Sequence, residues 1–151
     1  MDREAVNDAA TDPLTPYEIL GDEGIRDLVG AFYDAMDESP DVARIRAMHA
    51  QDLGPMKSLL TAYLTQWMGG PPVYLALRGS MCLNAPHMPY AIGPGERDMW
   101  LTCMDRALDR IGASDSLKAM LREPFRHVAD AVRNRGDSAP AHGKANIIAV
   151  G

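Results

Sequence analysis

The hydrophobic residues of this chain recur at helical spacing over most of its length. In the first such segment, residues three and four positions apart share one apolar face: Ile25, Leu28, Val29, Phe32, Tyr33 and Met36. This spacing predicts a helix over about residues 22–37, with Asp22 as its N-cap. A shorter helix over about residues 40–48 should follow, because Val42, Ile45 and Met48 repeat the pattern.

The second half of the chain continues in the same way. An apolar stripe from Met56 to Met68 predicts a helix that Gly69-Gly70-Pro71-Pro72 stops, and a short helical piece is expected around Tyr74–Leu77. Residues 79–94 are rich in Gly and Pro and leave room for a turn or two of helix. Two longer helices are then predicted, over about 94–112 and 115–135.

Details of the last predicted helix come from single residues. Ser114 or Ser116 should start it, and Pro124 should kink or interrupt it. No segment of the sequence alternates convincingly with a period of two. The sequence therefore predicts an all-α fold, in which residues 16–135 form one domain between a flexible lead-in, 1–15, and a tail, 136–151. The tail ends in an apolar run, Ile147-Ile148-Ala149-Val150, which could dock on the body.

Charge and composition narrow the classes of partner. With a net charge of −6 over 151 residues, the chain lacks the excess of positive charge that is typical of proteins that bind nucleic acid or an anionic membrane. It also has no apolar run of roughly 18 residues and no secretion signal at its start, which favours a cytoplasmic protein. Cys82 and Cys103 fit a reducing compartment, with Cys103 on an apolar stripe as a core residue.

The histidines are the main candidates for chemistry. His142 lies in the tail and His127 lies off the apolar stripe of its helix, so both are interpreted as surface residues, while His49 follows a predicted helix end. His87 stands between Pro86 and Pro89, which fix the backbone on both sides. A pinned imidazole suits a metal ligand, although a loop histidine is more often a surface residue. An all-α chain with one such ligand is compatible with a haem pocket.

Several ordered segments extend this interpretation to a family. The chain resembles the group II truncated haemoglobins over about residues 15–135, and the resemblance lies in Gly21–Ile25, Phe32–Asp34, Trp67–Pro71, Pro86–Gly93 and Glu96–Met104. It implies a globin-like two-over-two helical sandwich around haem b. It also implies a very short segment around the proximal histidine, in agreement with the Gly- and Pro-rich stretch at 79–94.

The resemblance also assigns roles to residues. His87 would be the proximal ligand of the haem iron, with the polar residues Tyr33, His49 and Trp100 around the bound gas and Met56 and Leu60 above the iron. Hydroxyl, indole and imidazole N–H groups can each donate a hydrogen bond to bound dioxygen, and such bonds count for more in a dry pocket. Further haem contacts are expected from Phe32, Tyr63, Leu83, Met88, Tyr90, Ile92, Lys57 and Arg78.

Three positions depart from the family pattern. Basic residues that normally pair with the haem propionates are replaced by Pro86, Asn84 and Leu59. Lys57 and Arg78 remain as nearby candidates for that pairing. The resemblance therefore supports iron ligation by His87 more firmly than it supports strong retention of the haem.

The function expected from these features is reversible binding of dioxygen and related diatomic gases, with redox or nitrogen-oxide chemistry as a further role. One alternative is an enzyme, a haem peroxidase or a nitric-oxide dioxygenase, which would need a separate reductase. Another is a haem-free helical sensor or interaction module, motivated by the missing basic residues. The sequence favours an oxygen-binding protein over a dedicated enzyme, and either a monomer or a homodimer is compatible with it.

Overall fold

The computed structural model describes residues 14–136, which fold into helices joined by short loops. The elements are α2 (Pro16–Glu38), η1 (Pro40–Val42), α3 (Ala43–Ala47), α4 (Gly54–Trp67), α5 (Val73–Arg78), α6 (Asn84–His87), α7 (Pro94–Arg110) and α8 (Asp115–Ala131). No strand occurs in this part of the chain, so the predicted all-α class is confirmed. None of the described helices is long and apolar enough to cross a membrane.

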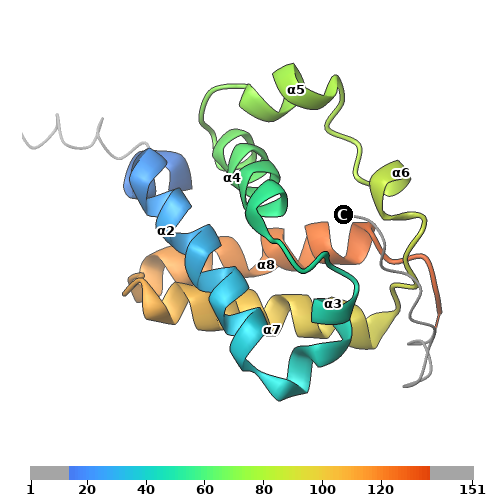
Figure 1. Ribbon diagram of the computed structural model, residues 1–151. Helices are drawn as coiled ribbons and strands as arrows, with labels where there is room; N and C mark the ends of the chain where they lie inside the picture. Colours follow the sequence, from blue (N-terminus) through green and yellow to red (C-terminus); the bar gives the residue numbers. More distant parts are fainter. Residues whose placement is uncertain (1–13, 137–151) are drawn as a thin grey trace, which may run out of the picture.

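The four longest helices form two layers (Figure 1). In one layer α2 packs against α4, and in the other α7 packs against α8, with α2 crossing over α7. The core between the layers is made of the stripes that the sequence predicts, and Ile25, Leu28 and Phe32 are fully buried in it. Cys103 is also buried in this core, as expected from its place on the stripe.

Helix α2 begins six residues earlier than predicted. Thr15 caps it: the Thr15 hydroxyl accepts a hydrogen bond from the Glu18 N–H, and the Glu18 carboxylate accepts one from the Thr15 N–H. Gly21, with φ of 71°, breaks the helical backbone within α2. Asp22, the predicted cap, instead accepts a hydrogen bond from the Tyr17 hydroxyl at 2.8 Å.

The start of α2 lies against the end of α4. The Tyr17 N–H donates to the Met68 carbonyl at 3.0 Å, and the Tyr17 ring packs over Gly70. A Cβ atom at Gly70 would lie 2.7 Å from the Thr65 carbonyl oxygen and 2.8 Å from that ring. Gly70 is therefore required by close packing as well as by the end of a helix.

Helix α8 differs from its prediction at two places. It ends at Ala131 and not at residue 135, and it continues through Pro124 without interruption. Pro124 lies on the exposed side, where the carbonyl that loses its helical partner can bind water. The prediction of Ser114 as the start is confirmed, since its hydroxyl accepts a hydrogen bond from the Leu117 N–H.

The stretch between α4 and α7 has little regular structure, as predicted. Helix α5 ends at Gly79, whose φ of 76° is left-handed, and α6 is a single turn that ends at His87. This stretch closes one side of the molecule beside α4 and α8 (Figure 1). The apolar run Ile147–Val150 and His142 lie outside the described residues, as does most of the expected lead-in.

Candidate functional site

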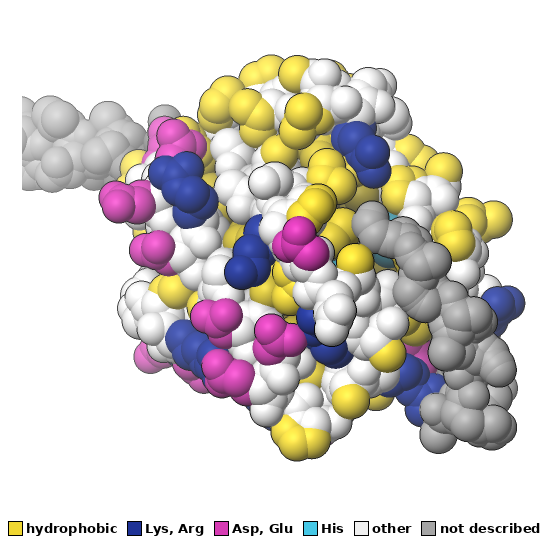
Figure 2. Space-filling view, in the orientation of Figure 1, with side chains coloured by type: hydrophobic (Ala, Val, Ile, Leu, Met, Phe, Trp, Pro, Cys, Tyr) yellow, Lys and Arg dark blue, Asp and Glu magenta, His cyan; other side chains and the backbone are white. Residues whose placement is uncertain are grey.

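A cavity of about 330 Å³ lies between the helical layers and the stretch that carries α6. Side chains from α2, α3, α4, α5, α7 and α8 line it, together with residues of the 79–92 stretch. On the face shown in Figure 2, apolar side chains surround a hollow in which some histidine surface is visible. The lining is mainly apolar, with few polar groups, which is typical of a site for a large apolar ligand.

Eleven of the residues proposed from the sequence line this cavity: Tyr33, His49, Met56, Leu60, Tyr63, Arg78, Leu83, His87, Tyr90, Ile92 and Trp100. Three others do not. Phe32 is fully buried one layer behind, where its ring contacts those of Tyr33 and Trp100. Met88 is 66% exposed and Lys57 is half-buried, and neither contributes to the lining.

His87 lines the cavity, and one of its ring nitrogens is bonded to the backbone. Its Nδ1 lies 2.7 Å from the Leu83 carbonyl oxygen, which can only accept, so Nδ1 carries the proton. Burial lowers the pKa of the His87 imidazole and favours its neutral form. The Nε2 lone pair is then available to a metal ion, and the ring orientation is set by the bond to Leu83.

His49, another residue of the cavity lining, has the same arrangement. Its Nδ1 donates to the Ile45 carbonyl oxygen at 2.8 Å, and burial lowers the pKa of the ring. A neutral His49 therefore presents an Nε2 lone pair, which accepts a hydrogen bond and cannot donate one. The sequence-based expectation of a third hydrogen-bond donor at His49 does not hold for this tautomer.

The loop that carries His49 is fixed by one arginine. Arg46 donates hydrogen bonds to the carbonyl oxygens of His49, Ala50 and Gln51, and it pairs with Asp37 of α2 at 2.6 Å. These contacts hold the loop between α3 and α4 in one conformation. The His49 ring also packs edge-on against Tyr33, with ring centroids 5.8 Å apart.

Because the pKa of His49 lies below its ordinary value in the folded chain, the stability of the apoprotein should depend on pH. The unfolded state binds a proton near the ordinary pKa of about 6.5 while the folded state does not, so this contribution is present above that pH. It is lost as the pH falls through the lowered pKa. Urea unfolding of the apoprotein between pH 7.5 and 5.5 should thus show a smaller pH dependence in His49→Gln than in wild type.

The exposed His127 of α8 provides the control for that measurement. His127→Gln should keep the wild-type pH dependence, since this side chain is exposed on α8 and is not part of the cavity lining. Equal pH dependence in the wild type and in His49→Gln would contradict the prediction.

Tyr33 and Trp100 bring polar tips to the cavity on otherwise buried rings. Tyr33 lies on α2 and is 3% exposed, and burial raises the pKa of its hydroxyl, which stays protonated. Within residues 14–136, the Tyr33 hydroxyl and the Trp100 indole N–H form no hydrogen bond. Both groups are therefore free to donate to a ligand in the cavity.

Much of the cavity wall could not be predicted from the sequence. Trp67 of α4 stacks on Phe125 of α8 with centroids 4.8 Å apart, and Phe125 contacts Trp100 edge-on at 5.7 Å. Tyr63 and Tyr74 form another edge-on pair at 5.1 Å. Further lining residues that were not proposed are Ile45, Met48, Leu59, Leu64, Pro86, Glu96, Arg97, Val128, Ala129 and Val132. Most lie on apolar helix stripes, where periodicity cannot separate a cavity wall from a packed core.

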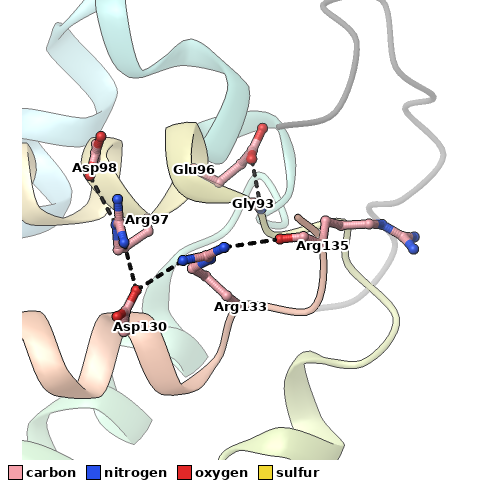
Figure 3. Close-up of polar contacts among 7 residues, drawn as sticks. All are labelled: Gly93, Glu96, Arg97, Asp98, Asp130, Arg133 and Arg135. Atoms are coloured by element: carbon pink, nitrogen blue, oxygen red, sulfur yellow. Dashed lines mark hydrogen bonds and ion pairs between the residues drawn. The ribbon is translucent and has the colours of Figure 1, made fainter. Parts of the chain in front are cut away.

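Two charged residues at the start of α7, Glu96 and Arg97, also line the cavity, and Figure 3 shows their contacts with Gly93, Asp98 and Asp130. Glu96 is buried, and its Oε1 accepts a hydrogen bond from the Gly93 N–H, while its Oε2 lies 3.4 Å from Nη1 of Arg44. Arg97 pairs with Asp98 at 3.0 Å and with Asp130 of α8 at 2.6 Å. These contacts join the start of α7 to α3 and to the end of α8.

The family follows from a comparison with known proteins. A family model described as bacterial-like globin matches residues 15–134, which is most of the chain. The chain belongs to this family. Bacterial-like globins are haem proteins that bind gases, so the cavity of this globin is its candidate haem site.

Individual relatives agree with this assignment. The globin is 33% identical over 106 residues to the group 2 truncated haemoglobin YjbI of Bacillus subtilis, covering 70% of this chain and 78% of that protein. Among solved structures, it matches the group II 2-on-2 haemoglobin of Agrobacterium tumefaciens with 38% identity and a TM-score of 0.76, over 82% of this chain and 96% of that one. The predicted two-over-two fold is thus confirmed.

A third similarity is to a truncated oxygen-avid haemoglobin from Bacillus subtilis. The identity is 30% and the TM-score 0.74, over 80% of this chain and the whole of that one. These matches span nearly all of each solved chain, so the likeness concerns the complete domain and not a fragment of it.

Proposed function

We propose that this globin holds haem b in the cavity, with His87 as the proximal ligand, and reversibly binds dioxygen and other diatomic gases. The observation that carries the proposal is the geometry of His87, a cavity-lining residue whose Nδ1–H is bound to the Leu83 carbonyl oxygen and whose Nε2 keeps its lone pair. A neutral, oriented imidazole is the form in which histidine ligates iron.

The residues that line the cavity fit a haem group. A porphyrin is a flat apolar ring, and the cavity walls offer aromatic and aliphatic side chains from both helical layers. Trp67, Phe125 and Tyr63 provide ring surface, and Met56 and Leu60 of α4 provide flexible apolar contacts. The two unpaired donors, Tyr33 and Trp100, would be costly in a dry pocket unless a polar ligand satisfied them.

The haem iron supplies the position at which a diatomic gas binds. Around that position the Tyr33 hydroxyl and the Trp100 N–H donate hydrogen bonds to a gas that carries partial negative charge. The apolar side chains keep water out, which strengthens both bonds. The name of the oxygen-avid relative from Bacillus subtilis supports this assignment, because two such donors slow the release of oxygen.

The propionates need basic partners, and the structure favours Arg78 over Lys57. Arg78 lines the cavity at its exposed rim and has no acidic partner among the described residues. Lys57 does not reach the lining. We therefore assign one propionate to Arg78, at the end of α5, and infer that the replacement of the family's basic residues by Pro86 and Leu59 weakens the retention of haem.

The proposal is tested by adding haem to the purified apoprotein and recording the absorption spectrum. We expect a Soret band that saturates at about one haem per chain, and a reversible spectral change when the ferrous protein is exposed to oxygen. Failure to form a saturable Soret band would overturn the haem assignment and favour a haem-free helical module. A Soret band without any change on adding oxygen, carbon monoxide or nitric oxide would overturn the gas-binding role.

One observation favours a second candidate, a haem peroxidase that uses a separate reductant. His49 lines the same cavity, and its Nε2 lone pair can accept a proton from hydrogen peroxide, as a general base must. Comparing turnover with peroxide and a reducing dye in the wild type and in His49→Leu separates this role from gas binding. Only a base-dependent enzyme loses turnover in that variant while it keeps oxygen binding.

A further inference from the structure

The segment that carries His87 has few supports of its own. Helix α6 is a single turn, too short to be stable alone, and Ala85, Pro86, Met88 and Pro89 around it are exposed. The hydrogen bonds of His87 Nδ1 and of the Met88 and Tyr90 N–H groups all stay within the segment. The position of the segment relative to the helical body must therefore be set from outside.

That support comes from Asn134, three residues after α8 ends. Its Nδ2 donates hydrogen bonds to the carbonyl oxygens of His87, at 3.2 Å, and Tyr90, at 2.8 Å. Its Oδ1 accepts one from the Ile92 N–H at 2.9 Å. The backbone N–H groups of Asn134 and Arg135 both donate to the Ile92 carbonyl oxygen, at 2.9 and 3.0 Å.

The orientation of the amide is unambiguous on chemical grounds. Two carbonyl oxygens require the NH₂ end and one backbone N–H requires the oxygen end, so a flipped amide would lose all three side-chain bonds. Five hydrogen bonds join residues 87–92 to the chain after α8, and each of them involves Asn134 or Arg135.

Asn134 is itself held where the end of α8 lies beside the start of α7. Figure 3 shows the chain after α8 turning back beside Gly93, with Arg133 reaching Asp130 and the Arg135 carbonyl. Asp130 in turn pairs with Arg97 of α7 at 2.6 Å. The two long helices of one layer thus form a rigid base from which Asn134 contacts the segment around His87.

We propose that Asn134 is a positioning residue for the proximal ligand: it fixes the His87 carbonyl, and through it the direction in which His87 Nε2 points into the cavity. The inference rests on the proposed role of His87 as iron ligand. Partners in the shell behind a ligand typically change metal affinity by about 10–100-fold when removed, so a measurable effect is expected although Asn134 is on the surface.

The test uses the full-length ferrous haem protein and two variants. Asn134→Asp keeps the acceptor for the Ile92 N–H but loses both donors, and Asn134→Ala loses all three side-chain bonds. We expect both to release haem to an acceptor protein about 10-fold faster. We also expect them to shift or broaden the iron–histidine stretching band in resonance Raman spectra. The exposed Arg135→Ala keeps its backbone bond to Ile92 and should match the wild type.

The position of the iron–histidine stretching band separates a positioning role from a merely structural one. It is a property of the folded haem protein and does not depend on the fraction of protein that is folded. Asn134 variants that melt at lower temperature but keep the wild-type band and haem release would overturn the inference. A His87→Gly variant is measured alongside. If it loses the band while the Asn134 variants keep it, only this inference fails; if it keeps the band, the role of His87 fails as well.

Discussion

A His87→Gly variant should lose the five-coordinate ferrous spectrum of the wild type and regain it when imidazole is added. Removing the side chain takes away the only nitrogen that the 79–92 stretch offers to the iron, within the described lining of the cavity. Glycine leaves a space of about the size of the ring, which free imidazole can fill. Because loss of a partner behind a ligand already costs about 10–100-fold in affinity, loss of the ligand should accelerate haem release by more than about 100-fold.

The matched control is His127→Gly or His127→Ala on the exposed side of α8, which should leave the spectrum and haem release unchanged. His49→Gly is the more informative comparison, since His49 also presents Nε2 to the cavity. If His49→Gly instead loses the five-coordinate spectrum and His87→Gly keeps it, the two histidines have been assigned to the wrong faces of the haem. A spectrum that survives both substitutions would show that another residue ligates the iron.

The helices were predictable because each buries one apolar stripe. Stripes at three- and four-residue spacing located α2, α4, α7 and α8, and the Gly- and Pro-rich composition of residues 79–94 predicted the short α6. The start of α2 was missed for a physical reason. Pro16 and Gly21 resemble helix breakers, but Pro is favoured in the first turn and Thr15 with Glu18 forms a capping box.

The site was predictable only where the resemblance to a family supplied roles. Tyr33 and Trp100 lie on apolar stripes, and periodicity alone would place them in the core. The same limit explains the missed wall of Trp67 and Phe125, since a helix face looks alike whether it meets another helix or a cofactor. His87 was conspicuous because of its flanking prolines, which is a local signal.

Two features of the candidate site depend on the folded backbone and could not be predicted from the local sequence. His49 changes from an expected donor to an acceptor because its Nδ1–H is committed to the Ile45 carbonyl oxygen. Asn134 contacts residues 42–47 positions away along the chain, and a polar residue after a helix end is otherwise unremarkable in sequence. Both follow from which backbone atoms the fold brings within 3.2 Å of a side chain.

Tyr33→Phe and Trp100→Phe should each release oxygen about 10-fold faster than the wild type. Each substitution removes one donor; Tyr33→Phe keeps the ring that packs against Phe32, and Trp100→Phe keeps a smaller aromatic ring there. A hydrogen bond of this kind contributes about 1–2 kcal/mol in a dry pocket, and about 1.4 kcal/mol corresponds to a factor of 10. Stopped-flow measurement of oxygen dissociation from the ferrous protein gives the rates directly.

The hydroxyl of Tyr74 offers a matched control, because this buried residue also lines the cavity but comes from α5 and packs against Tyr63. Tyr74→Phe should leave the rate within about twofold of the wild type. A Tyr33→Phe rate that is equally unchanged would show that the hydroxyl does not reach the gas. In the double variant, rates that do not multiply would show that both donors bind the same atom and compensate for each other.

His49, the third polar residue expected around the gas, should differ most from Tyr33 and Trp100 in its effect on oxygen release. Because neutral His49 presents a lone pair toward the cavity, it cannot hold oxygen by donating a hydrogen bond at pH 7. His49→Leu should therefore leave oxygen release unchanged or make it slower, in the direction opposite to Tyr33→Phe. A faster release in His49→Leu would mean that the ring carries its proton on Nε2 in the haem protein. That result would require the bond to Ile45 to break when haem binds.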